Sequence, residues 1–163
     1  MWRLSLLTLI VALAVTLAQP ASAADPAART PGAESFQLWS GHGRAVVLRK
    51  RGGSAILIVR RGRIRVIDLP GGAGELRTRC NRTGERVSPA AVEYRGPDVR
   101  CLVYGATPWQ AIARGHGISG SGVVRGSLTL DAFDEGPAGR FQIADRPVRR
   151  WPRAARTYSL LAQ

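Results

Sequence analysis

The stretch from Trp109 to Asp131, WQAIARGHGISGSGVVRGSLTLD, decides the fold of this chain. Its apolar and β-branched residues come in short runs separated by glycine, which predicts strand, glycine turn, strand, second glycine turn and strand. An earlier part of the chain repeats pieces of it, because Gly41-His42-Gly43 matches Gly115-His116-Gly117 and residues 59–66 match 123–130. Neither copy contains a nucleophile, a metal cluster or a phosphate loop in a recognisable arrangement. The two stretches therefore predict a fold and no specific reaction.

The same pattern of short apolar runs between glycine turns continues through the rest of the chain. Residues 61–66 alternate strictly, which places arginines on one face of a strand and Ile64 and Val66 on the other. Residues 54–59 are apolar throughout, which predicts a central strand covered on both faces. Arg-Gly recurs at Arg51, Arg61, Arg95 and Arg125, as arginine-flanked hairpin turns would require. The predicted strands are 35–40, 44–50, 54–60, 63–69, 75–80, 91–95, 98–104, 109–114, 123–133, 139–144 and 157–161.

No window of useful length places apolar residues at helical spacing, so little or no helix is expected. We predict an all-β fold, a single antiparallel β-sandwich or barrel-like domain over 35–163, with its strands joined as a meander. A short β-solenoid is the alternative, but it requires a fixed period, and the two glycine-rich stretches differ in spacing.

The N-terminus is typical of an export signal. A basic start is followed by an apolar run from Leu4 to Leu17, by Pro20 and by the small residues Ala21-Ser22-Ala23. The run is shorter than the ~20 apolar residues that span a bilayer, so no transmembrane anchor is expected after cleavage. We predict a signal peptide over 1–23, a disordered leader over 24–34, and a protein that is secreted, extracellular or associated with the cell envelope.

The chain contains two cysteines, Cys80 and Cys101, and both lie in strand-like contexts. In an oxidising compartment a lone pair of cysteines is most simply a disulfide, here a cross-strand or inter-sheet one. In the chain-entropy model, a bond closing a loop of about twenty residues stabilises by roughly 3 kcal/mol. The alternative is a pair of free buried thiols.

The chain is strongly basic, with 24 Lys and Arg against 11 Asp and Glu and a formal net charge of +13. Lys50 is the only lysine. Arginine binds phosphate and carboxylate through paired hydrogen bonds, so an anionic polymer or surface is the natural partner, although a GC-rich genome would also raise the arginine content. The candidate polyanion-binding residues are Arg60, Arg61, Arg63, Arg65, Arg77, Arg79, Arg149, Arg150 and Arg153. Further members of the two expected groups are Arg44, Arg49, Lys50, Arg51, Arg146 and Arg156, with Trp151 and Tyr158 interleaved in the second.

His42 and His116 are the only histidines, and they are the candidate metal ligands, with Asp68 and Asp131 as carboxylate partners. The alternative is an exposed histidine in each of two glycine turns. Ser119 and Ser121 lie in Gly-Ile-Ser-Gly-Ser-Gly, but no helix or downstream histidine follows, as a nucleophile elbow requires. The acidic group Asp131, Asp134 and Glu135 is interpreted as a solvated turn, with a weak calcium loop as the alternative. We therefore expect no catalytic residues and no cofactor.

Gly115-His116-Gly117-Ile118, the run 122–131 and Trp151-Pro152 together resemble a set of small exported β-proteins of high-GC Gram-positive bacteria. The resemblance covers the second half of the mature domain and implies no activity. We predict a non-enzymatic exported domain that binds an anionic cell-envelope polymer or surface through arginine-rich strands, with no specific nucleic-acid partner. The alternatives are a metal-dependent hydrolase around His116 and a self-assembling structural module that uses exposed strand edges.

Overall fold

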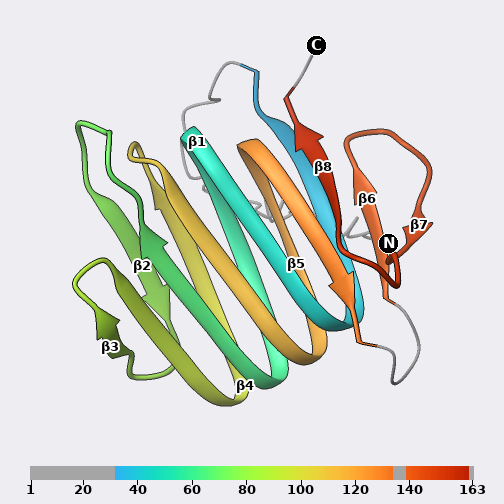
Figure 1. Ribbon diagram of the computed structural model, residues 1–163, viewed down its shortest axis with the longest axis horizontal. Coiled ribbons are helices and arrows are strands. Elements are labelled where there is room, and N and C mark those ends of the chain that lie inside the picture. Colours follow the sequence, from blue (N-terminus) through green and yellow to red (C-terminus); the bar gives the residue numbers. More distant parts are fainter. Residues whose placement is uncertain (1–31, 134–138, 162–163) are drawn as a thin grey trace, which may run out of the picture.

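The computed structural model describes residues 32–133 and 139–161, except for the side chains of Lys50 and Arg51. The predicted signal peptide, residues 24–31 of the predicted leader and the acidic turn at 134–137 lie outside the described residues. The described part consists of strands and turns without helix, which confirms the all-β prediction (Figure 1). Its strands are β1 (Glu34–Asp68), β2 (Leu76–Cys80), β3 (Glu85–Ser88), β4 (Ala91–Gly105), β5 (Trp109–Ala132), β6 (Arg140–Ile143), β7 (Arg149–Arg150) and β8 (Arg156–Leu160).

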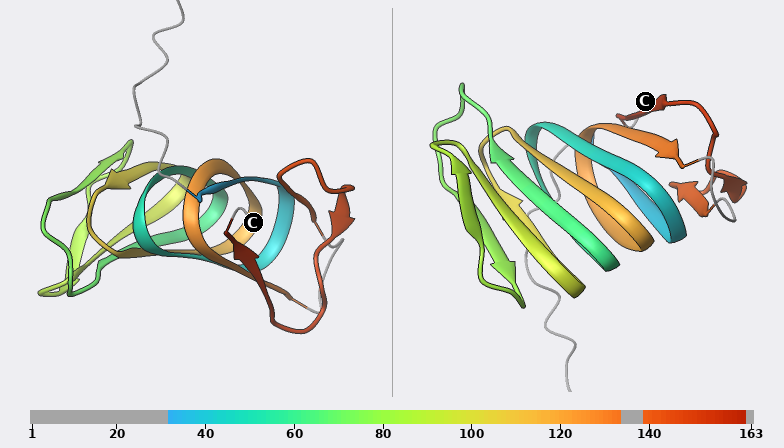
Figure 2. Two further views of the ribbon diagram at one scale, coloured as in Figure 1. Left: turned by 90° about the horizontal axis from the view of Figure 1, so that it is seen from above. Right: turned by 60° about the horizontal axis from the view of Figure 1, so that its bottom comes forward.

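The long strands β1, β4 and β5 wind as a flattened coil. Each runs along one side of the domain, bends and returns along the other side (Figure 2). Two successive stretches of β1, 34–49 and 53–68, both pair antiparallel with residues 109–124 of β5, which lie between them. Successive turns of β1 are therefore separated by a strand of opposite direction. This antiparallel winding distinguishes the domain from a solenoid, and it satisfies the predicted sandwich or barrel-like description.

The coil has two layers that belong to one continuous antiparallel sheet. Layer A contains 34–40, 53–59, 99–105 and 118–124, extended by β2 and β6. Layer B contains 43–49, 61–68, 91–97, 109–116 and 126–132, extended by β3 and β8. The predicted meander is wrong, because strands pair mainly with partners far away in the sequence.

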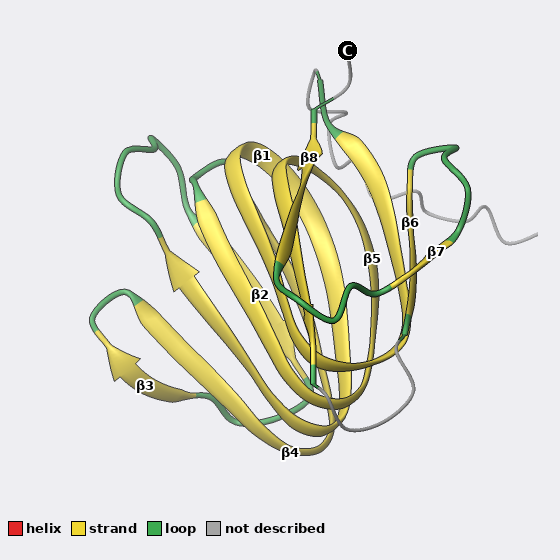
Figure 3. Ribbon diagram, turned by 45° about the vertical axis from the view of Figure 1, so that its right-hand side comes forward, coloured by secondary structure: helices red, strands yellow, loops and turns green. Residues whose placement is uncertain are grey.

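The glycines that were expected to form turns instead lie at bends inside continuous strands. Gly96, Gly62, Gly115 and Gly43 pair in a row across four neighbouring segments, and each has a φ between 131° and 150°. A Cβ on Gly62 would collide with the backbone of Arg114 and Gly115, so only glycine allows the strands to approach this closely at the bend. The row folds the sheet from one layer to the other while the strands continue through the bend (Figure 3), where the pairing of β1 with β5 shifts register between Leu38 and Gly43.

The core lies between the layers, and alternate residues of each segment enter it. Ile64 and Val66 are buried while Arg63 and Arg65 point outward, as the alternation predicted. Residues 54–59 differ from the prediction: Ala55, Leu57 and Val59 are buried, but Ile56 is 42% exposed. This segment is covered on one face only, because layer A has solvent on its outer side.

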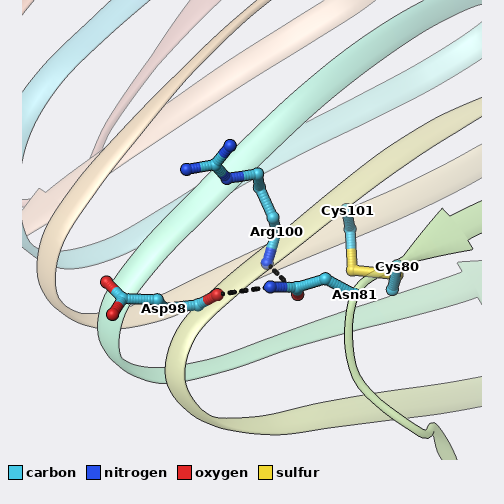
Figure 4. Close-up of a disulfide and its surroundings, with 5 residues drawn as sticks. All are labelled: Cys80, Asn81, Asp98, Arg100 and Cys101. Carbon is cyan, nitrogen blue, oxygen red and sulfur yellow. Dashed lines mark hydrogen bonds between the residues drawn. A yellow bond between two sulfur atoms is a disulfide. The ribbon is translucent and has the colours of Figure 1, made fainter.

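The predicted disulfide is confirmed. Cys80 and Cys101 are bonded across β2 and β4 as directly opposite residues (Figure 4). Asn81 extends the junction, since its side-chain amide donates to the carbonyl oxygen of Asp98 and its side-chain oxygen accepts from the backbone of Arg100, both at 2.8 Å. The bond therefore pins the edge strand β2 to the coil. The part of the chain that the structure describes forms no helix long and apolar enough to cross a membrane.

Candidate anion-binding face

Four arginines form a row across the outer surface of layer B, directly beside the glycine row. Arg63 pairs with Arg95 on one side and with Arg114 on the other, and Arg114 pairs in turn with Arg44. All four point outward, because the residues that alternate with them enter the core. Arg65 lies on the same face one step along β1. We call these five arginines, together with Glu93, the basic face: Arg44, Arg63, Arg65, Arg95, Arg114 and Glu93.

Glu93 is a carboxylate within this face, and its side chain is fully buried beneath arginines, while Asp131 lies opposite Arg44 at the end of the row. Arg65 donates to it with an N–O distance of 2.7 Å, Arg95 also hydrogen bonds to it, and Arg63 lies 3.8 Å away. Burial raises the pKa of Glu93, but the hydrogen bonds from Arg65 and Arg95 and the charge of Arg63 outweigh burial and leave the pKa below its ordinary value. Glu93 is thus ionised at neutral pH and offsets part of the local positive charge.

The other end of the row carries less compensation. Within residues 32–133 and 139–161, no carboxylate lies within ion-pair distance of Arg44 or Arg114. Arg114 instead lies over the ring of Phe133, 5.7 Å from its centroid. A hollow of about 130 Å³ opens among these side chains, lined by Arg44, Arg63, Arg65, Glu93, Ile112 and Arg114. Its cationic lining suits an oxyanion.

The two histidines meet on the same side of the sheet, beyond the glycine row. Their Nδ1 atoms are 2.9 Å apart and their rings contact edge to face, with centroids at 5.1 Å. His116 also pairs with Arg61 across the strands. The hollow at this bend measures about 500 Å³ and is lined by Ser40, His42, Arg60, Arg61, His116 and Gly117. Arg61, Arg63 and Arg65 occupy every second position of one strand and therefore lie on the same face. The hollow, which Arg61 lines, thus continues the basic face to the edge of layer B.

The structure divides the predicted arginines among separate places. Arg63 and Arg65 belong to the basic face, and Arg60 and Arg61 to the histidine hollow. Arg77 and Arg79 project from β2 on the outside of layer A, whereas Arg149 and Arg150 form β7 at the opposite end of the molecule. Arg153 is exposed in the connection that leads from β7 to β8.

Two expectations about the arginine groups are wrong. Arg49 is fully buried, and it donates to the backbone carbonyls of Gly105, Thr107 (2.7 Å) and Ala106 (3.3 Å). Burial lowers its pKa to about 10. Trp151 is only 3% exposed and its indole N–H donates to the carbonyl of Arg140 at 3.0 Å, so its ring is unavailable to stack on a ligand. Arg49 fixes a corner of the coil, and Trp151 closes its end.

Of the four predicted metal ligands, the structure brings together only the two histidines. His42 and His116 converge, but Asp68 lies at the far end of layer B, where it pairs with Trp109. Asp131 is opposite Arg44, one step from the histidines. The described residues contain no group of three or more His, Cys, Asp or Glu side chains that is able to hold a metal ion. Ser121 is exposed on the outside of layer A, away from the histidines.

Arg95 and Arg114 were missing from the predicted site, although the sequence contains a signal for Arg114. Gly41-His42-Gly43-Arg44 read backwards is Arg114-Gly115-His116-Gly117. A mirrored repeat places identical residues opposite each other when two strands pair antiparallel, and here Arg44 faces Arg114 and Gly43 faces Gly115. A forward comparison of the two stretches does not show this pairing, because antiparallel strands pair in opposite directions.

Comparison with known proteins adds no relative. No family model matches the chain, and neither a curated protein nor a solved structure matches it. The resemblance to small exported β-proteins stays a prediction.

Proposed function

We propose that this protein is an exported binding domain that holds an anionic cell-envelope polymer against its basic face. The observation that carries the proposal is the row of arginines facing one another across four neighbouring segments, with Arg44 and Arg114 at its less compensated end. Like charges directly opposite each other on adjacent strands destabilise a sheet. A bound polyanion removes that cost, because each guanidinium then gains a charge-assisted partner.

The shape of the row favours a polymer over a single small ion. Adjacent strands lie ~4.8 Å apart, so four side chains in a row spread their charge over about 15 Å. The two hollows, about 130 Å³ and 500 Å³, follow one another along the same face. An extended chain of phosphate groups would contact several arginines at once, and guanidinium forks match phosphate oxygens.

The proposed location follows from the predicted export signal and from the Cys80–Cys101 disulfide, a bond that persists in oxidising compartments. In such a compartment the partner that suits the basic face is an envelope polymer rich in phosphate. Removal of the predicted signal peptide takes away only Arg3 from a chain of net charge +13, so a net charge of +12 would bring the mature protein to such a polymer, and the basic face would fix where the polymer lies.

The test is a titration of the mature chain with poly(glycerol phosphate), followed by calorimetry and by NMR of the arginine Nε–H groups. We expect the Nε–H signals of Arg44, Arg63 and Arg114 to shift most. If about four phosphates are contacted, raising salt from 50 to 200 mM should weaken binding by about 50-fold.

Three results would contradict the proposal. One is binding that does not change with salt. Another is shifts confined to Arg77, Arg79 or β7. A third is binding to vesicles of anionic phospholipid without binding to the polymer, which would make a lipid surface the partner instead. Size measured over a range of protein concentrations distinguishes the self-assembly alternative, which requires growth without polymer.

A further inference from the structure

The histidine pair is arranged so that its charge state controls its geometry. With Nδ1 atoms at 2.9 Å, one imidazole must present an N–H and the other a lone pair. Adding a second proton leaves two N–H groups facing each other, and this contact then becomes repulsive. Imidazole is the side chain that changes charge between about pH 5 and pH 8. The pair is therefore stable with at most one proton on its facing nitrogens, unless an anion enters between the two rings.

The surroundings of the pair favour an anion over a metal. Arg60 and Arg61 line the same hollow, and Gly117, with a φ of 65°, makes room for the Arg60 stem, against which a Cβ would collide. The other charged groups that face the pair are Arg114 and Arg44 in the next row, with Asp131 beyond Arg44. Phe133 packs against His116 at 6.1 Å and is neutral. A cation would meet guanidinium groups here, and the described residues offer it no third ligand.

We propose that His42, His116, Arg60 and Arg61 form a proton-gated oxyanion site, which takes a phosphate or sulfate group when the histidine pair is doubly protonated. The ligand oxygens accept from both imidazoles and from the guanidinium groups, and binding takes up protons from solvent. This inference rests on the proposed function in one respect. Because the site continues the basic face, it would raise the affinity for the polymer as the pH falls.

Inorganic sulfate is the probe, because it stays a dianion throughout the relevant pH range and any pH dependence therefore belongs to the protein. The chain has only two histidines, so every imidazole NMR signal reports on this pair. We expect affinity for sulfate to be at least tenfold higher at pH 5.5 than at pH 7.5. Saturating sulfate should move the titration midpoints of both imidazoles to higher pH, and calorimetry in buffers of different ionisation heat should show proton uptake.

His42→Gln and His116→Gln should each reduce the pH dependence to the share of the remaining imidazole, and the double variant should remove it, whereas Arg60→Gln should weaken sulfate binding and keep the pH dependence. Should a glutamine variant fail to fold, the imidazole titration of the unmodified protein decides alone. Sulfate affinity that is equal at both pH values overturns the inference, as does Zn²⁺ binding at neutral pH that displaces protons from both rings. Either result leaves polymer binding at Arg44 and Arg114 untouched. Loss of polymer binding with intact proton-gated sulfate binding would refute the proposed function alone.

Discussion

The outer surfaces of the two layers are built by the same strands, yet they carry opposite kinds of side chain. On layer B, β1, β4 and β5 present the basic face. On layer A, the centre of the surface has hydroxyl, amide and aliphatic side chains, with Ile56 and Val123 exposed at 42% and 45%. We call this set the neutral face: Ser35, Gln37, Ile56, Ser121, Val123 and Gln142.

This difference between the layers separates the number of arginines in the chain from their position on the sheet. A GC-rich genome raises the number of arginines, but it does not choose which side of a strand they occupy. Along β1, the outward positions of 53–59 are uncharged and those of 61–65 are arginine. Arginines do flank the neutral face: Arg100 of β4 is exposed opposite Ile58, and others lie on β2 and on β6 and β7. Its centre, among the residues that the structure describes, contains none.

The largest expected effect comes from Arg49, which is buried at 0% exposure and belongs to neither face. Replacing Arg49 with Met removes the donors for three backbone carbonyls at a corner of the coil, and we expect unfolding free energy to fall by about 3 kcal/mol. Arg44→Met on the basic face should change it by less than about 0.5 kcal/mol. Denaturant unfolding of both variants measures the difference. Equal effects would mean that burial does not distinguish these arginines.

The next largest effect concerns Glu93, the buried carboxylate that offsets the positive charge of the neighbouring arginines. Glu93→Gln leaves Arg63, Arg65 and Arg95 without their shared partner, and we expect a loss of about 2 kcal/mol at pH 7. The matched control is Glu75→Gln. Its ion pair with Arg77, at 3.4 Å, joins side chains that are 75% and 63% exposed, so its loss should cost less than about 0.5 kcal/mol. If both variants lose equally little, Glu93 does not stabilise the basic face.

The pKa of Glu93 sharpens this prediction. Because its folded-state pKa lies below the ordinary value, its ionised form contributes stability above about pH 4.3. That contribution is lost as the pH falls through the lowered folded-state pKa. The gap in unfolding free energy between the natural protein and Glu93→Gln should therefore be full at pH 7 and narrow below about pH 4. A gap that stays constant down to pH 3 would assign the effect to packing instead of charge.

The smallest effect has the opposite sign. Arg114 lies between Arg63 and Arg44, so Arg114→Gln should raise unfolding free energy by about 0.3 kcal/mol at low salt, and added salt should remove the gain. Arg79→Gln is the control: it also loses an aromatic contact, to Tyr104 at 6.0 Å, but its cross-strand partner is Leu102. Destabilisation by both variants would show that the arginine row is not under repulsion.

The sequence predicted the features that depend on residues close together in the chain. Alternation at 61–66 identified the buried Ile64 and Val66, and the cysteine pair predicted the disulfide. The coil itself was not predictable in this way, because a glycine that allows a bend within a strand looks like a glycine that ends a strand. The pairing of 34–49 and 53–68 with the same part of β5 is also invisible to any short window. The candidate site was incomplete for the same reason, because Arg95 and Arg114 lie beside Arg63 only through pairing between strands far apart in the sequence.

The proposed function requires that position on the sheet, and not total charge, governs polymer binding. The measurement is the affinity for poly(glycerol phosphate) at one fixed ionic strength, for Arg44→Gln/Arg114→Gln and for Arg77→Gln/Arg79→Gln. The two double variants remove the same charge from opposite layers. We predict at least a tenfold loss for the first and less than a threefold loss for the second. Equal losses would show that the protein binds by net charge alone and would contradict the assignment of a binding face.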